Sequence, residues 1–148
     1  MKFAHENISD PVNEDIAAKE FWSTQTSQKL EYTEESHVAR VLCELAVELQ
    51  CGDIFEFGCA AGRNLNFLRE ELKHRGLQIT ASGIDLNQPA IELGRRKFGL
   101  DLSLGDENDL KKYGLNSFDL VFTVSVLDHM PDPMQAIQSL MGTCRGIG

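Results

Sequence analysis

The stretch that decides the fold is Ile54-Phe55-Glu56-Phe57-Gly58-Cys59-Ala60-Ala61-Gly62-Arg63-Asn64. It reads as a short apolar strand with an acidic residue near its end, followed by a tight glycine turn and the start of a helix. A helix that begins at the carboxyl edge of a sheet presents free backbone N–H groups there, and such edges bind nucleotide-like ligands in α/β folds. The stretch therefore predicts a strand–turn–helix unit that holds part of such a ligand.

The spacing of the glycines indicates which kind of nucleotide is bound. A dinucleotide fingerprint requires glycines at positions 58, 60 and 63, but position 60 is Ala and position 63 is Arg. A glycine falls at position 62 instead, which gives Glu-x-Gly-x-Ala-x-Gly over residues 56–62. This pattern resembles the first motif of class I S-adenosylmethionine-dependent methyltransferases, commonly written acidic-x-Gly-x-Gly-x-Gly. Ala60 departs from that motif, because its methyl group narrows the approach of a ligand to the backbone.

Strands and helices are expected to alternate along the rest of the chain. Val38, Val41, Leu42, Leu45 and Leu49 recur at helical spacing, which predicts an amphipathic helix with Thr33 as its N-cap. We expect strands at 53–57, 78–84, 102–104 and 118–124, and helices at 34–50, 65–76, 87–99 and 132–141. This alternation predicts a parallel sheet with right-handed crossover connections.

The amino-terminal part of the chain is expected to differ from the rest. Residues 1–15 are polar and mixed in charge, which is typical of a loose leader. Residues 16–31 carry Phe21 and Trp22 among polar residues and are expected to form a helical or irregular lid. We therefore divide the chain into a leader and lid segment at 1–33 and a cofactor-binding domain at 34–148.

Three later segments add to the resemblance. Asp85 ends the second expected strand, where its carboxylate can accept hydrogen bonds from both ribose hydroxyls; dinucleotide enzymes use the same device. The segment 104–110 resembles the third methyltransferase motif, in which an Asp accepts from the adenine amino group. The segment 118–133 resembles the fourth motif and following loop of small-molecule methyltransferases of the Type 11 and Type 25 kind. These motifs occur in the family's order, over residues 50–142.

The resemblance implies a Rossmann-like doubly wound α/β fold with strand order 3-2-1-4 and S-adenosylmethionine as cofactor. It implies that the adenine of the cofactor contacts Leu86, Asp106 and Glu107. It also implies that Val124 lines the methionine portion of the cofactor, whose carboxylate is held by the helix start after Gly62. The implied cofactor-binding residues are Glu56, Gly58, Cys59, Ala60, Gly62, Asn64, Asp85, Leu86, Asp106, Glu107 and Val124. Phe21, Trp22 and Tyr32 are candidates for an aromatic cover of the cofactor, with core packing as the alternative.

His129 is the candidate catalytic residue, because an imidazole can take a proton from an acceptor near neutral pH. The alternative is that His129 is a loop residue that packs near the cofactor, and Asp128 shares this ambiguity. The resemblance implies methyl transfer to a small-molecule acceptor. Two alternatives stay open: a catalytically inactive cofactor-binding module, and an NAD-dependent oxidoreductase, which Arg63 disfavours.

Composition narrows the classes of partner that the chain is expected to bind. The net charge of −9 argues against a nucleic-acid surface and against an anionic membrane, and no apolar run is long enough to span a bilayer. Cys43, Cys51, Cys59 and Cys144 lack metal-site spacing, so we expect reduced thiols and no metal. The first residues, Met-Lys-Phe-Ala-His-Glu-Asn, are too polar for a signal peptide, and with no membrane-spanning run we expect a cytoplasmic location.

The end of the chain departs from the family pattern. The family's sheet has seven strands, whereas Gly148 falls where only the approach to a fifth strand would begin. The resemblance therefore implies an incomplete domain that lacks the carboxyl-terminal strands. It also implies that the strand at 118–124 is a sheet edge through which the chain can self-associate.

Overall fold

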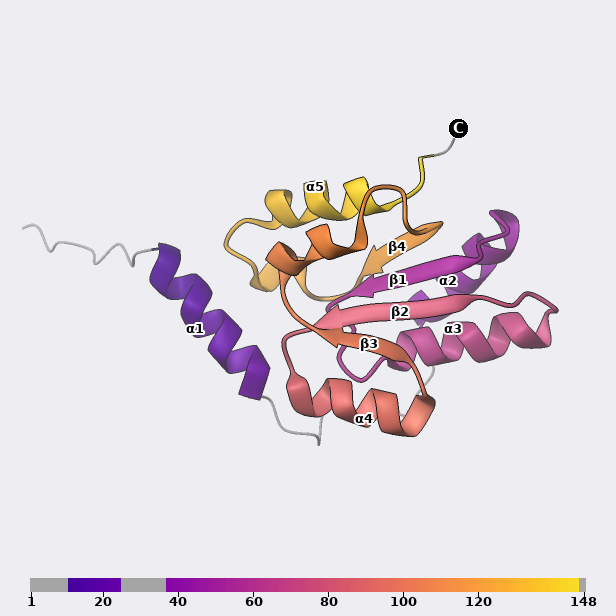
Figure 1. Cartoon of the computed structure of the whole chain (residues 1–148), viewed down its shortest axis with the longest axis horizontal. Coiled ribbons are helices and arrows are strands. Elements are labelled where there is room, and N and C mark those ends of the chain that lie inside the picture. Colours follow the sequence, from indigo (N-terminus) through magenta and orange to yellow (C-terminus); the bar gives the residue numbers. More distant parts are fainter. Residues whose placement is uncertain (1–10, 25–36, 147–148) are drawn as a thin grey trace, which may run out of the picture.

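A parallel four-stranded sheet forms the centre of the molecule (Figure 1). The computed structural model describes residues 11–24 and 37–146. The strands are β1 (Asp53–Phe57), β2 (Thr80–Asp85), β3 (Asp101–Leu104) and β4 (Leu120–Thr123), in the order β3-β2-β1-β4. This confirms the predicted order 3-2-1-4, and β1 lies at the centre because it pairs with both β2 and β4.

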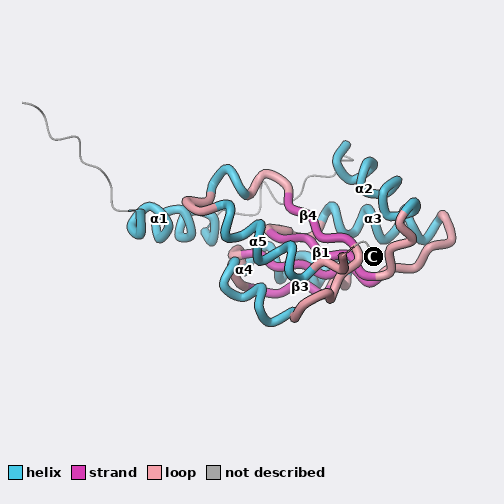
Figure 2. Tube along the Cα trace, turned by 90° about the horizontal axis from the view of Figure 1, so that it is seen from above, coloured by secondary structure: helices cyan, strands magenta, loops and turns pink. Residues whose placement is uncertain are grey.

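Helices cover both faces of the sheet, as in a doubly wound fold (Figures 1 and 2). The helices are α1 (Pro11–Thr24), α2 (His37–Glu48), α3 (Arg63–His74), α4 (Gln88–Phe98) and α5 (Pro133–Thr143), with 3-10 helices η2 (Glu107–Tyr113) and η3 (Leu127–His129). Side chains of α2, α3 and α4 share one apolar cluster with the sheet, and those of η2 and α5 share the other. Helix α1 stands apart from these layers, beyond the carboxyl ends of the strands.

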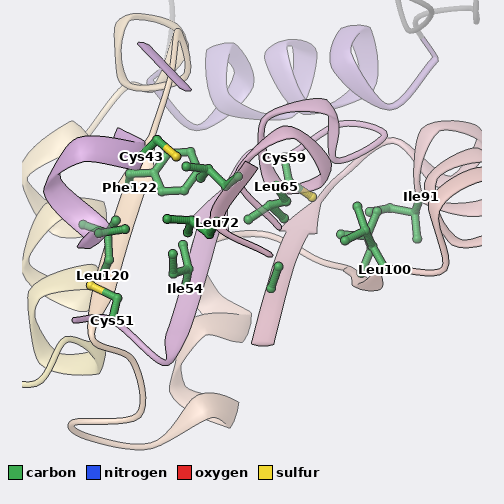
Figure 3. Packing of buried hydrophobic residues seen from close by; sticks show 14 residues of the cluster. Cys43, Cys51, Ile54, Cys59, Leu65, Leu72, Ile91, Leu100, Leu120 and Phe122 are labelled. Atoms are coloured by element: carbon green, nitrogen blue, oxygen red, sulfur yellow. The ribbon is translucent and has the colours of Figure 1, made fainter. Parts of the chain in front are cut away.

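The alternation of side chains along β1 separates the two cores. Ile54 belongs to the cluster under α2, α3 and α4, whereas Phe55 and Phe57 belong to the cluster under η2 and α5. Successive strand residues point to opposite faces, so a central strand buried on both faces is apolar on both. Figure 3 shows the first cluster, in which Leu120 and Phe122 of β4 and Ile91 and Leu100 near α4 are labelled.

Local capping signals begin the helices that follow β2 and β4. The Asn87 side chain accepts a hydrogen bond from the Ala90 backbone N–H (3.0 Å), so it caps α4 as expected. Gly99 ends α4 in the left-handed region with φ 62°. Asp132 caps α5 in the same way by accepting from Gln135 N–H (3.1 Å). These caps fix where the loops after β2 and β4 leave the sheet edge.

One expectation about the amino-terminal part was wrong. Residues 11–15 are helical, not a loose leader, because Pro11 lies in the first turn of α1, where a missing N–H and a fixed φ are tolerated. The expected helix is present as α2, which buries Ala39, Cys43 and Ala46 and leaves Val41 exposed. Thr33, Tyr32 and the rest of 25–36 lie outside the described residues.

The segment after α5 returns to the sheet. Cys144 forms an isolated parallel bridge with Phe118, and the Arg145 N–H donates to the Phe118 carbonyl (2.7 Å). The Arg145 guanidinium also contacts Asp53 (2.9 Å) and Asp119 (2.6 Å). The last described residues therefore lie beside the outer edge of β4. In the described part of the chain, no helix is long and apolar enough to cross a membrane.

Candidate cofactor site

A cavity of about 580 Å³ opens where β1, β2 and β4 end. This volume lies within the usual range for small-molecule sites. Its walls come from the turn after β1, the end of β2, the start of η2, the segment after β4, and α1. The lining residues are Asp15, Ala18, Lys19, Trp22, Phe57, Gly58, Ala60, Ile84, Asp85, Leu86, Asn87, Gly105, Asp106, Glu107, Val124, Ser125, Val126, His129 and Met130.

The turn after β1 depends on backbone conformations that favour glycine. Gly58 and Gly62 have φ values of 74° and 77°. The Gly58 and Cys59 N–H groups both donate to the Ile84 carbonyl, at 2.8 and 3.1 Å, which ties the turn to β2. A side chain at Gly58 would also collide with Val126, since an added Cβ would lie 2.3 Å from its Cγ2. The first glycine of the motif thus permits close packing of the turn against the segment after β4.

Ala60 occupies the position at which the family motif has a glycine. Its φ is 48°, in the left-handed region where an L-residue with a Cβ is strained by about 1–2 kcal/mol. Ala60 lines the cavity, so its methyl group does reach the place where the sequence predicts a narrower approach. Ala60 therefore occupies this position of the turn at the expense of backbone strain.

Asp85 connects the turn with the start of α4. Its Oδ2 accepts from Ala60 N–H (2.8 Å) and its Oδ1 accepts from Asn87 N–H (2.8 Å). Burial raises the pKa of this carboxyl above its ordinary value, while the backbone N–H groups of Ala60, Asn87 and Leu86 oppose the rise. A carboxylate has about four acceptor positions, so acceptor capacity remains for a ribose hydroxyl. Asp85 therefore fits a nucleoside sugar as well as holding the turn.

Glu56 lies below the turn, not on the cavity wall. It is 2% exposed, and its Oε1 accepts from Asn64 Nδ2 (2.9 Å). Its Oε2 has no hydrogen-bond partner among the described residues. Burial raises the pKa of Glu56 to about 8, the Asn64 hydrogen bond opposes the rise, and the charge of Asp85 adds to it. A protonated Glu56 therefore supports the turn from beneath, and it accepts a hydrogen bond from the side-chain amide of Asn64.

The two acidic residues after β3 meet a cation from α1. Asp106 caps η2 by accepting from Asn108 N–H (2.8 Å) with its Oδ1. Lys19 Nζ donates to Asp106 Oδ2 at 3.0 Å and to Glu107 Oε1 at 3.1 Å. Burial lowers the pKa of Lys19, but the hydrogen bonds to Asp106, Glu107 and Asp15 outweigh that effect and raise it overall. A cationic Lys19 therefore partly neutralises this acidic end of the cavity.

His129 lies at the opposite wall, in the segment after β4. Its ring centroid is 4.6 Å from that of Trp22, with the ring planes tilted by 46°. Its Nε2 is 3.5 Å from Asp128 Oδ2, and its side chain is 42% exposed. Val124 and Ser125 line the cavity next to it, and Ser125 has a positive φ of 56°. The imidazole thus faces the cavity and also packs against α1.

The structure brings together most of the residues predicted from the sequence. Gly58, Ala60, Asp85, Leu86, Asp106, Glu107, Val124 and His129 line the cavity. Glu56, Cys59, Gly62 and Asn64 are not on its wall and form the support of the turn. Trp22, a candidate cover, does line it. Asp15 and Lys19 were not predicted, since no motif marks residues that reach the cavity from so far away in the chain. Met130 was not predicted either, although it follows His129 within the segment 118–133.

The sheet is parallel, and the cavity lies at the carboxyl ends of β2, β1 and β4, where the order of the strands reverses. Nucleotide-binding α/β proteins hold their ligands at this position. The family model described as "Methyltransferase domain" matches residues 55–146. The chain belongs to this methyltransferase domain family.

Individual relatives agree with this assignment. The ubiquinone biosynthesis O-methyltransferase of Nitrosomonas europaea is 29% identical over 94 residues, which cover 58% of this chain and 36% of that protein. The plantazolicin methyltransferase BamL, in complex with a triazolic desmethylPZN analog and SAH, is 17% identical with a TM-score of 0.66, over 90% of this chain and 53% of that one.

A TehB-like SAM-dependent methyltransferase from Corynebacterium glutamicum is 16% identical with a TM-score of 0.61, over 94% of this chain and 71% of that one. These structural likenesses confirm the Rossmann-like fold. The chain spans about a third of the length of the curated relative and about half of that of BamL.

Proposed function

We propose that this chain binds S-adenosylmethionine in the cavity and serves methyl transfer to a small-molecule acceptor. The position of Asp85 carries the proposal. Its carboxylate lies at the cavity wall, accepts from the Ala60 N–H of the glycine turn, and keeps acceptor capacity for a ribose hydroxyl. Membership of the methyltransferase domain family supports it, and so does the SAH in the structures of BamL, a protein of similar fold.

The chain's own residues would bind and orient the reactants. When bound, the cofactor supplies an activated methyl group on a sulfonium, so no covalent nucleophile is needed. Asp85 would hold the ribose, Asp106 would accept from the adenine amino group, and Val124 would pack beside the methionine portion. Alignment of an acceptor with the methyl–sulfur bond, with water excluded, can contribute about 7–11 kcal/mol.

His129 has two roles open to it. It faces the cavity, so it can take a proton from an acceptor hydroxyl or amine. Its ring contact with Trp22 favours the second role, packing beside the cofactor. His129→Asn separates them. Loss of turnover with SAH affinity unchanged indicates a base. A parallel loss of affinity indicates packing.

Two other functions are separated from the proposal by direct assays. A catalytically inactive cofactor-binding module would bind SAH in a calorimetric titration but release no methyl product. An NAD-dependent oxidoreductase would bind NAD in competition with SAH. Position 63, Arg in this chain, argues against the NAD alternative because a dinucleotide turn needs glycine there for close helix packing.

The remaining partner predictions belong with this proposal. Among the described residues, the outer edge of the segment 118–124 is bridged only at Phe118, by Cys144. Self-association through 118–124 therefore stays a prediction, and sedimentation would test it. The net charge of −9 supports a ligand that is not a nucleic acid. A cytoplasmic location is supported by the free thiols of Cys43, Cys51, Cys59 and Cys144.

The proposal is tested by the affinity of Asp85→Asn for SAH. An amide cannot offer a second acceptor oxygen, and a hydrogen bond to a charged group contributes about 1.5–3 kcal/mol, so we expect affinity to fall about 10- to 100-fold. Asp101→Asn is the matched control, because Asp101 is exposed at the amino end of β3. Equal affinities of Asp85→Asn and the wild type would refute the proposed site.

A further inference from the structure

In the part of helix α1 whose side chains the structure describes, residues 15–24, no buried side chain anchors the helix over the cavity. None of the side chains at 15–24 is buried, and Ile16 and Phe21 are 51% and 52% exposed. Figures 1 and 2 show α1 beyond the carboxyl ends of the strands, outside both helical layers. A helix that buries little apolar surface belongs to the least stable part of a fold. Polar contacts must therefore decide whether α1 stays in place.

Lys19 makes the densest set of these contacts. Its Nζ lies 3.0 Å from Asp106 Oδ2 and 3.1 Å from Glu107 Oε1, on the far side of the cavity opening, and 3.1 Å from Asp15 of its own helix. The side chains of Lys19, Asp106 and Glu107 are 27%, 21% and 15% exposed, so solvent screens them only in part. Charge-assisted hydrogen bonds of this length are the strong kind.

Two further contacts hold the last turns of α1. The Trp22 carbonyl accepts from Asn87 Nδ2 (3.0 Å), and the Trp22 ring packs on His129. The same Asn87 caps α4 with its Oδ1. Helix α1 is thus attached to the end of β2, to the start of η2 and to the segment after β4, which are three separate walls of the cavity.

Helix α1 forms part of the cavity wall without filling the cavity. It supplies Asp15, Ala18, Lys19 and Trp22 to the walls, yet about 580 Å³ remains inside. Asp106 also keeps acceptor capacity, because a carboxylate that receives Lys19 and one backbone N–H has positions left for a further donor. A bound nucleoside and a closed α1 are therefore compatible.

We propose that Lys19 latches α1 over the bound cofactor and, as a positioning residue, sets how fast the cofactor leaves. The proposal rests on the cofactor site proposed above. Opening requires that Lys19 leave Asp106 and Glu107 and that Trp22 leave His129. Cofactor release then follows the breaking of ion pairs, so it speeds up with ionic strength.

The test uses SAH and the single tryptophan of the sequence, Trp22. Surface plasmon resonance gives the association and dissociation rates of SAH, and acrylamide quenching of Trp22 emission, without ligand, reports the opening of α1. Lys19→Met removes the latch and Lys19→Arg keeps the charge. Lys112→Met is the control, because it removes an ion pair with Asp109 within η2 (2.9 Å).

We expect Lys19→Met to release SAH about tenfold faster and to increase the quenching of Trp22, while Lys19→Arg and Lys112→Met stay within about twofold of the wild type. Raising NaCl from about 0.05 M to about 0.5 M should speed release from the wild type and leave Lys19→Met unchanged.

Other results would overturn the latch. They are an unchanged dissociation rate in Lys19→Met, faster association with unchanged dissociation, or faster dissociation with unchanged quenching. The last would mean that Lys19 contacts the cofactor and does not hold α1. If the wild type binds no SAH, the proposed function fails, and the quenching comparison alone still supports or refutes the latch.

Discussion

Substitution of Gly58 by Ala tests whether the glycine turn packs against the segment after β4. Gly58 has a φ of +74°, and an added Cβ would lie 2.3 Å from Val126 Cγ2 and 3.3 Å from its Cβ and Cγ1. Val126 is β-branched, so its side chain has few alternative rotamers. The new methyl group therefore adds strain in the backbone and overpacking against Val126.

The two effects have separate magnitudes. The left-handed conformation costs an Ala about 1–2 kcal/mol, and the lost flexibility of the unfolded chain returns about 0.4–1 kcal/mol. Overpacking adds about 1–3 kcal/mol. We expect Gly58→Ala to lower the free energy of unfolding by about 2–4 kcal/mol. Gly76→Ala is the matched control, since Gly76 has a φ of +80° and no atom within 4 Å of an added Cβ.

Urea denaturation measures both variants, and the difference between them isolates the collision with Val126. We expect Gly58→Ala to be at least about 1 kcal/mol less stable than Gly76→Ala. Addition of Val126→Ala should bring the two substitutions closer, as a double-mutant cycle would report. Equal losses in Gly58→Ala and Gly76→Ala would refute the packing of the turn on Val126.

Two further predictions concern the same turn. Ala60→Gly should raise the free energy of unfolding by about 0.5–1 kcal/mol in thermal denaturation, because strain at φ 48° is relieved while the unfolded chain becomes more flexible; a loss of stability would contradict it. Burial raises the pKa of Glu56 to about 8 from its ordinary 4.5, so the folded protein keeps a proton that the unfolded chain releases. The stability that this retained proton gives to the fold is complete below pH 4.5 and is lost as the pH rises through about 8. Between these pH values the stability of the wild type should therefore fall by up to about 5 kcal/mol more than that of Glu56→Gln. Equal pH slopes in urea denaturation would contradict this.

The strands and part of the cavity wall could be predicted because their signals are local. β1 matches its predicted bounds, 53–57, since a continuous apolar run ends at a glycine turn. Asp85 and Asn87 were found because the residue that ends a strand and the one that caps the next helix lie close together in sequence. The predicted strand at 118–124 shortened to β4, with Phe118 joined only through its bridge to Cys144.

Helix α2 was predicted, but the residues that it buries were not, for a physical reason. Ala39, Cys43 and Ala46 also recur at helical spacing, but they are smaller than Val41 and Leu45. Small side chains allow α2 to approach its neighbours closely, whereas a prediction weighted by side-chain size selects the larger stripe. The surface against which a helix packs decides which of the two stripes is buried. The sequence of the helix alone does not specify that surface.

Lys19 could not be predicted for a different reason. It reaches Asp106 across 87 positions of the chain, and a lysine between Ala18 and Glu20 has no local signal. The hydrogen bond between Asn64 and Glu56 is local, at a separation of eight residues. The motif nevertheless suggested that both side chains contact the ligand, because spacing alone does not tell which polar groups satisfy each other.

The most direct measurement is a crystal structure of the protein grown with SAH. We expect the nucleoside in the cavity, its ribose hydroxyls within hydrogen-bond distance of Asp85 and its adenine beside Leu86 and Asp106. Difference density at another place on the molecule, or a cavity that holds only water at saturating SAH, would contradict the proposed site.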